Sequence, residues 1–429
     1  MTTTYDPHDP GYFEEPDLRE ELTRVYDLCH GCRLCFKFCP AFPGLFEMVD
    51  AYDGEVGELT DAQQDRVVDE CYQCKLCYVN CPYTPPHEWQ LDFPRLMLRA
   101  QAVRHKKHRL TPADQFLGRT DLVGRLSTAT APIVNRFTGT PGSFPRKVME
   151  KTVGIAAERL LPPYSRRRFS TWWKQRVKPL LTTRQAEVAL FPTCLVEYQN
   201  PAIGHDTVKV YERNGVECTL PEGQVCCGMP WLDGGDVAHF EKQGHQNVGI
   251  LAEQVRQGRD IVVPQPTCAY VIRREYPEYL KSDDARLVAE HTFDAAEYLM
   301  KLHRGDGTEL DTVFDGEVPA QVTYHVACHL RAQQIGLKAR DLIKLMGTEV
   351  TLANTCSGID GTWGYKKENY EMARDVAAGL RQEVEDAGND LVVGDCHLAN
   401  GSITQETGHV PQHPIQVLAR AYGIPAEEP

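Results

Sequence analysis

The sequence has no uninterrupted apolar run near the roughly 18 residues that a membrane-spanning helix needs, and its mean hydropathy is −0.41. Residues 1–10 have neither the basic start nor the apolar stretch of a secretory signal peptide. We therefore expect a cytoplasmic protein, and structural disulfides are rare in that compartment. Sixteen cysteines in such a setting favour metal binding.

Nucleotide- and flavin-binding loops are also missing. The glycine-containing segments 233–236 and 358–361 do not follow a strand with the spacing of a dinucleotide-binding loop. The chain has 429 residues, of which 42% are hydrophobic and 25% are charged. This composition excludes wholesale disorder, and the length predicts roughly two to four domains.

Positive charge is concentrated in one segment. The net charge is −14, yet residues 95–184 contain 20 Lys and Arg residues against four acidic ones. The segment carries about +16 and the rest about −30, a balance that argues against nucleic acid as a partner. Three interpretations stay open: the segment packs on the protein's own acidic domains, contacts an anionic membrane or binds an acidic protein. The candidate membrane or partner residues are Arg166, Arg167, Arg168, Trp172 and Trp173.

Eight cysteines form two similar runs near the N-terminus. In each run three cysteines are separated by pairs of residues, and a fourth, followed by proline, comes after three more residues. This is the bacterial spacing for two four-iron clusters, in which the fourth cysteine of each run binds the other cluster. Zinc, which also takes four thiolates, is the alternative. We assign one cluster to Cys29, Cys32, Cys35 and Cys81, and the other to Cys71, Cys74, Cys77 and Cys39.

Local patterns predict the elements around these runs. Thr60 is an N-cap candidate and Gln63 completes a capping box, so a helix should cover residues 60–70. Residues 91–109 also have a helical pattern. From about residue 186, short apolar runs alternate with longer helical stretches, which is typical of parallel sheets. The expected strands contain residues 188–191, 261–263, 322–324, 350–352 and 391–393.

The second half of the chain contains an internal duplication. Three cysteines of the first copy recur in the second at offsets of 134, 130 and 128 residues. In each copy the cysteines follow a strand, where loops converge in folds of this kind. The paired positions are Cys194 and Cys328, Cys226 and Cys356, and Cys268 and Cys396.

The first copy has four cysteines that suit a third cluster. Adjacent Cys226 and Cys227 cannot point the same way from an extended backbone, so we expect Gly228 to supply the turn that presents both. The alternative is that these cysteines act as small buried hydrophobes, which is what we expect of Cys218 in its strand. The candidate ligands are Cys194, Cys226, Cys227 and Cys268.

The second copy is less complete, because Ser357 stands where the first copy has Cys227. Three thiolates with an imidazole suit zinc. They also suit a cluster with one open or non-thiolate corner, or a site that no longer binds metal. The candidate ligands are Cys328, Cys356, Cys396, His329 and His397, with His325 and Asp395 nearby.

At these residues the sequence resembles a family in which two four-iron clusters precede two cysteine-rich "CCG" domains. Its members include the C subunit of anaerobic glycerol-3-phosphate dehydrogenase, the glycolate oxidase iron–sulfur subunit and heterodisulfide reductase subunits. The resemblance to the first type covers nearly the whole chain. It rests on Cys194-Leu-Val-Glu-Tyr-Gln-Asn-Pro201, Cys226-Cys-Gly-Met-Pro230, Pro266-Thr-Cys-Ala-Tyr270, Tyr324-His-Val-Ala-Cys-His329 and the segments 358–370 and 413–418.

The resemblance implies an α+β multidomain fold. We expect a helical two-cluster ferredoxin-like domain over residues 21–100 and a basic helical arm over 101–185. A duplicated α/β CCG domain should follow over 186–310 and 311–429. Segments 71–77, 82–89 and 419–423 are similar to a subgroup whose genes often lie near rubrerythrins. The chain departs from the five-cysteine sites of heterodisulfide chemistry, because its two sites have four and three cysteines.

The expected function is that of an iron–sulfur electron-transfer subunit. It would relay electrons between a flavoprotein dehydrogenase or reduced carrier and a quinone or a rubrerythrin-like acceptor. One alternative is a redox enzyme that acts at an open metal site in the second CCG domain, with a histidine as acid–base group. Another is an adaptor whose basic arm holds it on the inner face of the cytoplasmic membrane.

Overall fold

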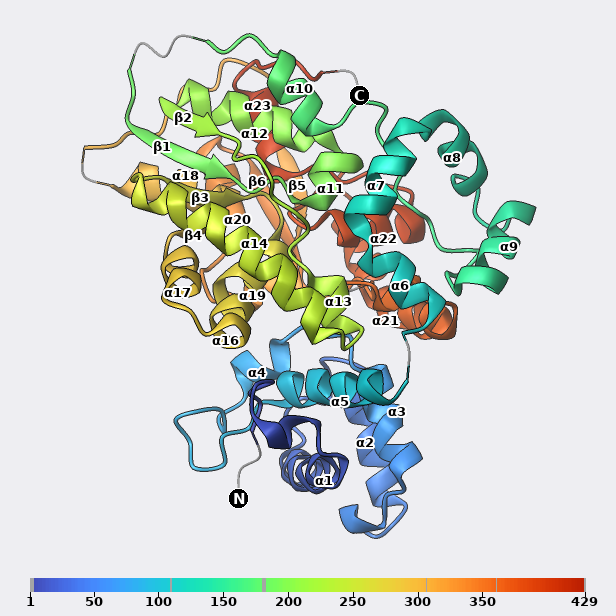
Figure 1. Cartoon of the computed structure of the whole chain (residues 1–429). Helices are drawn as coiled ribbons and strands as arrows, with labels where there is room; N and C mark the ends of the chain where they lie inside the picture. Colours follow the sequence, from blue (N-terminus) through green and yellow to red (C-terminus); the bar gives the residue numbers. More distant parts are fainter. Residues whose placement is uncertain (1–3, 109, 180–182, 306, 360, 428–429) are drawn as a thin grey trace.

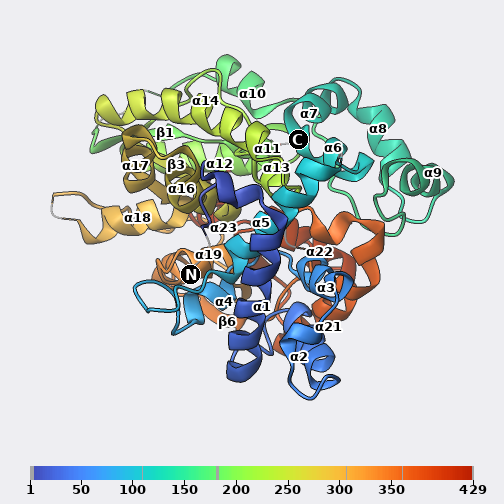
Figure 2. The ribbon, with the colours of Figure 1, turned by 60° about the horizontal axis from the view of Figure 1, so that its bottom comes forward.

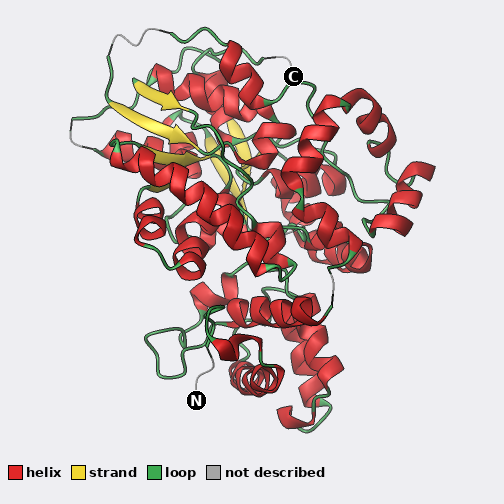
Figure 3. Ribbon diagram, viewed as in Figure 1, coloured by secondary structure: helices red, strands yellow, loops and turns green. Residues whose placement is uncertain are grey.

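The structure is a computed structural model that describes residues 4–108, 110–179, 183–305, 307–359 and 361–427. A helical N-terminal domain lies below two α/β domains in Figure 1, and a helical arm lies along their right-hand side. Figure 3 shows the strands in the centre of the upper part, with helices around them.

The N-terminal domain consists of helices around an apolar core. The predicted capping box is confirmed, because Gln63 N donates to Thr60 Oγ1 at 3.3 Å and Thr60 N donates to Gln63 Oε1 at 2.9 Å. The helix expected over residues 91–109 is also present, slightly shorter at each end. The elements are η1 (Pro10–Phe13), α1 (Glu15–Cys32), α2 (Ala41–Asp50), η2 (Val56–Glu58), α3 (Asp61–Glu70), α4 (Leu76–Asn80) and α5 (Phe93–Lys107).

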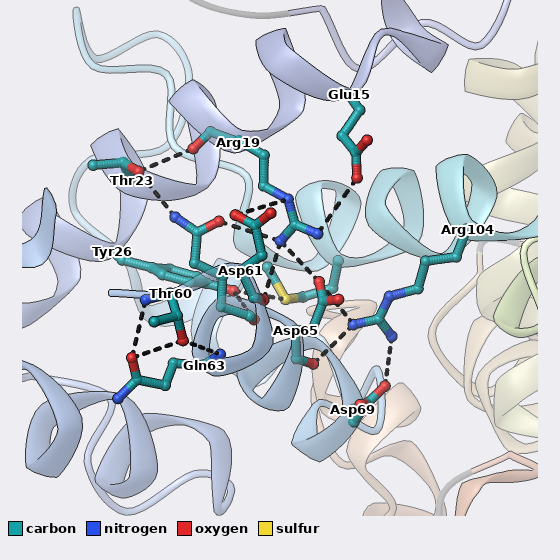
Figure 4. Close-up of polar contacts among 12 residues, drawn as sticks. Glu15, Arg19, Thr23, Tyr26, Thr60, Asp61, Gln63, Asp65, Asp69 and Arg104 are labelled. Atoms are coloured by element: carbon teal, nitrogen blue, oxygen red, sulfur yellow. Dashed lines mark hydrogen bonds and ion pairs between the residues drawn. The ribbon is translucent and has the colours of Figure 1, made fainter. Parts of the chain in front are cut away.

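Ion pairs hold α3 between α1 and α5 (Figure 4). Arg19 on α1 lies 2.8 Å from Asp65 on α3, and Arg104 on α5 lies 3.0 Å from the same carboxylate. The Arg104 guanidinium also donates to Asp69 at 2.5 Å. Because one cysteine run precedes α3 and the other follows it, these pairs help to fix the two runs relative to each other.

The basic arm is made of short helices that pack on the first α/β domain. Gly118 and Gly124 allow a close approach: a Cβ on Gly118 would lie 2.5 Å from the ring of Trp231, and one on Gly124 would overlap Tyr198. The helices are α6 (Pro112–Gly118), α7 (Thr120–Ala129), α8 (Ala131–Thr138), α9 (Phe144–Val153) and α10 (Phe169–Gln175).

The structure corrects one part of the predicted arm surface. Trp172 is 5% exposed and stacks on His205, with ring centroids 4.2 Å apart. Trp173 is half-buried beneath the guanidinium of Arg176. Trp172 therefore packs inside the protein, whereas Arg166 and Arg167 are exposed as expected. Trp172 therefore packs in the hydrophobic core and is not available for a contact at the surface.

The first α/β domain contains a four-stranded parallel sheet in the order β2-β1-β3-β4. The expected strands at 188–191 and 261–263 are present, and Cys218 lies in β2 as predicted. The elements are β1 (Ala186–Leu190), α11 (Thr193–Tyr198), α12 (Pro201–Arg213), β2 (Val216–Thr219), α13 (Met229–Asp233), α14 (Val237–Arg256), β3 (Asp260–Val263), α15 (Pro266–Tyr270), the π-helical turn η3 (Val271–Glu275), α16 (Tyr276–Leu280), α17 (Asp283–Glu290), β4 (Thr292–Asp294) and α18 (Ala295–Arg304).

The second α/β domain contains a three-stranded parallel sheet in the order β6-β5-β7. Its strands lie where the apolar runs predicted them. The elements are β5 (Gln321–His325), α19 (Cys328–Ala332), α20 (Lys338–Leu345), β6 (Glu349–Ala353), η4 (Trp363–Tyr365), η5 (Lys367–Asn369), α21 (Tyr370–Ala387), β7 (Val392–Gly394), α22 (His397–Thr407) and α23 (Pro414–Ala421).

The two sheets share one hydrophobic core. Val188 and Val262 from the first sheet belong to the same buried cluster as Val322 and Val393 from the second. Parallel strands that are covered on both faces are typically apolar along their length, which explains why these runs were visible in the sequence. The α/β part is therefore one packed body, and Figure 2 shows the N-terminal helices lying across it.

Replacing Gly118 by alanine should weaken the packing of the arm on this body. The added methyl group would overlap the ring of Trp231, and overpacking of this kind costs about 1–3 kcal/mol. We expect a lower urea midpoint and faster proteolysis between α6 and α9. The control is Gly249→Ala in α14, where a Cβ meets open space and should add about 0.5–1 kcal/mol of stability. Equal losses in both variants would contradict this account of the interface.

Candidate metal centres

The N-terminal domain contains two small hollows, each lined by four cysteines. The structure brings the cysteines together crosswise, in the sets assigned from the sequence. Phe42 lines both hollows and separates them. The first hollow is lined by Cys29, Cys32, Cys35 and Cys81, and the second by Cys39, Cys71, Cys74 and Cys77.

The backbone turns in the same way at both hollows. Arg33 and Lys75 occupy equivalent places between the second and third cysteines of their runs, and both have positive φ, at 54° and 64°. This left-handed conformation reverses the chain direction between the flanking cysteines. The repeated sequence spacing is therefore matched by a repeated local geometry.

Each hollow offers a donor set of four thiols. Four thiolates suit a four-iron cluster, and they also suit zinc.

A third set of cysteines meets at the carboxyl ends of β1 and β3. Cys194 lies on α11 and Cys268 on α15, and the Sγ atoms of Cys194 and Cys226 are 3.9 Å apart. Gly228 has a φ of 89°, so the turn expected after Cys226-Cys227 is confirmed. All four cysteines line one cavity. Cys218, by contrast, is 1% exposed in β2 and belongs to a different buried cluster from this set.

Hydrogen bonds hold the Cys226-Cys227 peptide in place. Asp121 on the arm accepts from Cys226 N at 2.9 Å, and Tyr276 Oη donates to the carbonyl of Cys227 at 2.9 Å. Burial raises the pKa of Asp121 to about 6. The arm therefore takes part in forming this site, which the sequence did not indicate.

The second copy places three cysteines around a further hollow. Cys328, Cys356 and Cys396 line it together with Ser357, which takes the place of the fourth thiol. Gln265 of the first copy donates to Cys396 Sγ at 3.2 Å. The sequence-predicted thiols are thus brought together, and a side chain from the other copy reaches them.

His329, one of the predicted histidines, lines this hollow and has partners in two other domains. His329 Nε2 donates to the carbonyl of Gln73 at 3.0 Å, and its Nδ1 accepts from Thr267 Oγ1 at 3.0 Å. Burial lowers the pKa of His329 to about 4, so the ring is neutral and both nitrogens are engaged. His329 thus lines the hollow and also bridges two other domains. Its role as a metal ligand stays a prediction.

His325 also lines the hollow, beside His329, although the sequence pattern does not single it out as a ligand. It is 1% exposed, and burial lowers its pKa to about 4, which leaves a neutral ring suited to a metal. His397 begins α22 beside Cys396, and its pKa is lowered to about 4 by the same cause. The sequence could have indicated His325 as a candidate, because it lies at the end of β5, three residues before Cys328.

The second N-terminal hollow adjoins the second CCG site. Cys39 and Cys74 belong to the same buried cluster as Cys328 and Cys356. Tyr72 lies in this cluster, with its ring centroid 5.1 Å from that of Trp363. The core of the N-terminal domain contacts cysteines of both hollows, among them Cys29 and Cys81 of the first and Cys71 and Cys77 of the second. The second hollow therefore lies between the first hollow and the CCG sites.

A hydrogen-bonded connection runs from the second hollow toward the first CCG site. Gln73 Nε2 lies 3.6 Å from Cys71 Sγ, and the carbonyl of Gln73 accepts from His329. Thr267 donates to the other nitrogen of that ring and directly precedes Cys268 in sequence. The sulfur atoms at the two ends are thus joined through Gln73, His329 and Thr267.

A buried ion pair fixes this junction. Lys75 Nζ lies 3.3 Å from Glu275 Oε1, and both residues are at most 2% exposed. Burial opposes ionisation of Glu275, yet its pKa is below the ordinary value because Lys75 and Arg95 are beside it. A buried charge of this kind is tolerated only with a partner in place.

Comparison with known proteins identifies the N-terminal domain and both copies of the α/β domain. The family described as "Cysteine-rich domain" (CCG) matches residues 188–273 and again 322–400. The "Citrate utilization protein B Fer4-like domain" matches residues 22–108. The C subunit of anaerobic glycerol-3-phosphate dehydrogenase from Escherichia coli K12 is 34% identical over 309 residues, which are 71% of this chain and 76% of that protein. The chain belongs to the family of these C subunits.

More distant relatives match about half of the chain. "Lactate utilization protein A" of Bacillus pumilus is 29% identical over 246 residues, which are 54% of this chain and 96% of that protein. The protein of the same name from Bacillus subtilis is 27% identical over 225 residues, 49% of this chain and 87% of that protein. Two CCG matches confirm the duplication read from the cysteine offsets.

Cysteine-to-serine variants should reveal which thiols share a hollow. Cys39→Ser and Cys74→Ser should perturb the same electron paramagnetic resonance (EPR) signal, because both residues line the second hollow. Cys32→Ser and Cys81→Ser should perturb the other signal. Each variant should lose up to about four irons per chain. Cys218→Ser is the matched control and should keep both signals; a Cys39→Ser spectrum that resembles Cys32→Ser would contradict crosswise sharing.

Proposed function

We propose that the protein relays single electrons between a dehydrogenase partner and a separate acceptor. The observation that carries this proposal is the buried contact between the second four-cysteine hollow and the second CCG site. A cluster in each hollow would supply a group that takes up and gives back one electron at a time. The chain itself excludes water from the contact and holds the cysteine-bearing segments in register through Lys75, Glu275 and His329.

The cofactors we propose follow from the donor sets. The two N-terminal hollows would hold two [4Fe–4S] clusters, and the four thiols of the first CCG site would hold a third iron–sulfur cluster. The second CCG site, with three thiols and His325, has a donor set for zinc or for a cluster with one non-thiolate corner.

The partners are proposed from the relatives' names. One relative is named as part of an anaerobic glycerol-3-phosphate dehydrogenase, which supports a flavoprotein dehydrogenase as the electron donor. A lipid quinone or a rubrerythrin-like protein would be the acceptor. A second candidate function is a redox enzyme that binds a small substrate at the second CCG site, and the replacement of a thiol by Ser357 favours an open corner there.

A membrane contact is also part of the proposal. None of the helices over the described ranges is both long and apolar enough to cross a bilayer. Helices α7–α9, however, expose several large apolar side chains among exposed basic residues. We call this surface the arm face. Its apolar residues are Leu122, Leu126, Ile133, Phe137, Phe144 and Val148, and its basic residues are Arg119, Arg125, Arg136, Lys147 and Lys151.

The arm face has the composition of an interfacial surface. Its positive charge stands out in a chain of net charge −14, and Lys and Arg near an anionic bilayer contribute about 1 kcal/mol each. Phe144 is 79% exposed and Leu126 63%, so both have apolar surface to insert among lipid headgroups. We propose that this face rests on the cytoplasmic membrane.

Removing the bridge at His329 should slow the relay without removing the clusters. His329→Leu removes both hydrogen bonds that join Gln73 to Thr267. Each buried group left unpaired lowers the stability of the folded protein by about 1–3 kcal/mol. Iron content should stay at the wild-type value, which we expect to be at least about eight per chain. Freeze-quench EPR after reduction should show slower passage of electrons from the N-terminal signals to the CCG signal.

His329→Gln is the conservative control for that experiment. Its amide keeps a donor and an acceptor, so it should recover part of the rate. An unchanged rate of electron transfer in His329→Leu would show that the His329 bridge has no part in the relay. A wild-type protein with fewer than about eight irons per chain would contradict the relay proposal itself.

The arm face should bind anionic vesicles in a salt-sensitive way. Phe137→Ser and Phe144→Ser each remove about 1.5–3 kcal/mol of apolar burial, which corresponds to at least about tenfold weaker binding. Flotation with phosphatidylglycerol vesicles should also fall as salt shortens the screening length from about 10 Å at 0.1 M to about 3 Å at 1 M. Phe36→Ser is the control, because Phe36 is 55% exposed on the N-terminal domain. Equal binding by all variants would contradict the arm face as the contact.

A further inference from the structure

The two cysteine runs of the N-terminal domain differ at one position between their first two cysteines. Gln73 stands there in the second run, and Gly31 stands there in the first. Gln73 is 7% exposed and has a φ of 60°. Residues with a side chain are strained in this left-handed region, whereas glycine is not. A glutamine at a position that suits glycine points to a role for its side chain.

Both polar atoms of the Gln73 amide have partners. Its Oε1 accepts from Lys75 Nζ at 2.6 Å. Its Nε2 donates to the carbonyl of Pro94 at 3.2 Å and lies 3.6 Å from Cys71 Sγ. An ammonium group has only donors, so it must face the amide oxygen, and this fixes the orientation of the amide. The two hydrogens on Nε2 are therefore directed at the Pro94 carbonyl and at the sulfur.

Lys75 is a buried cation that is held next to this amide. It is 2% exposed, with Nζ 3.3 Å from Glu275 Oε1 and 5.9 Å from the centre of the Tyr270 ring. An ammonium that donates to an amide oxygen polarises the amide and makes its N–H groups stronger donors. The charge of Lys75 therefore acts on Cys71 through Gln73.

The equivalent part of the first run has a different electrostatic setting. Arg33 takes the place of Lys75, but its side chain is exposed and pairs with Asp50. Solvent and salt screen a charge at the surface much more than a buried one. At the first hollow, Cys81 Sγ accepts from Tyr83 N at 3.4 Å, a backbone contact that does not depend on a charged side chain. The two hollows thus present similar thiols in unlike surroundings.

We propose that Gln73 and Lys75 raise the reduction potential of the cluster proposed for the second hollow. This inference rests on the proposed function, because it requires a cluster there. Each electron that arrives adds one negative charge, which burial opposes and which a polarised N–H group and a cation stabilise. The electron that leaves the first hollow is the one that the second hollow gains, and no bond or proton changes. It is thus held beside the second CCG site.

An anaerobic redox titration of the intact holoprotein, followed by EPR, measures the potentials. The signal of the second hollow is the one that Cys74→Ser perturbs. In Lys75→Met, the ratio of reduced to oxidised centres at a fixed potential should fall about tenfold. This corresponds to a midpoint about 59 mV lower for one electron. Lys75→Arg keeps the cation at a backbone position whose equivalent already holds Arg33, so its midpoint should stay close to the wild-type value.

Gln73→Gly tests the amide separately and gives the second run the residue that the first run has. The φ of 60° suits glycine. The backbone carbonyl that accepts from His329 is also retained, so we expect the fold and the bridge to His329 to survive. Loss of the bond to Cys71 Sγ should lower the ratio of reduced to oxidised centres about threefold. The signal of the first hollow should keep its midpoint.

Arg33→Met is the matched control, because it removes a cation from the equivalent position of the first run. Its charge is exposed and already paired with Asp50. We therefore expect the first signal to change less than about twofold in its ratio of reduced to oxidised centres. The second signal should not change.

The outcomes separate this inference from the relay. Unmoved midpoints in both Lys75→Met and Gln73→Gly would overturn it, and so would a Lys75→Arg midpoint as low as that of Lys75→Met. Equal shifts of both signals would also contradict it, because a local field acts on one hollow. Iron content shows whether each variant is loaded, and Gln73→Gly decides if Lys75→Met loses its iron. A wild-type protein without two reducible EPR centres would contradict the relay itself, whereas unmoved midpoints leave the relay intact.

Discussion

A lysine and a glutamate that solvent barely reaches hold the N-terminal domain against the first CCG domain. Lys75 lies between two cysteines of the second hollow, and Glu275 lies on the turn that follows α15. An unpaired charge in this interior would cost several kcal/mol, so neither domain can slide without uncovering one. Because His329 also joins the second CCG domain to Gln73, three domains meet in one fixed arrangement. The packing of the three domains therefore fixes the distances between the sulfur sites.

Parallel sheets explain where the second pair of sites lies. In such sheets loops converge at the carboxyl ends of the strands, and both CCG copies place their cysteines there. The copies then differ in what surrounds the thiols. The first has four cysteines and a cavity under the arm, whereas the second has Ser357 and two histidines in a much smaller hollow. One fold has thus been fitted with two different chemical environments.

Local signals were sufficient for much of this architecture. The helix capped by Thr60, the strand at 261–263 and the turn at Gly228 each depend on residues close in sequence, and all were found where expected. The crosswise cysteine sets could also be read, because the spacing restricts which thiols can reach one hollow. Contacts between distant segments could not be read in this way.

The burial of Trp172 shows why contacts between distant segments could not be predicted from the sequence. Its stacking on His205 depends on how α10 packs on α12, and a basic flanking sequence gives no sign of that. The two bonds of His329 likewise depend on Gln73 and Thr267, which belong to two other domains. The cavity beneath the arm arises from several separate segments of the chain. Such features follow from tertiary packing and not from periodicity.

The crosswise arrangement of the N-terminal cysteines has a consequence for how the chain matures. Cys81 completes the set begun by Cys29, while Cys39 completes the set begun by Cys71. A ribosome that has released only the first run has therefore made neither set whole. If the proposed clusters occupy these sets, their loading would have to wait until the end of the second run has emerged. A truncation between the runs would then leave both sets incomplete, although a simple count of motifs suggests that one is intact.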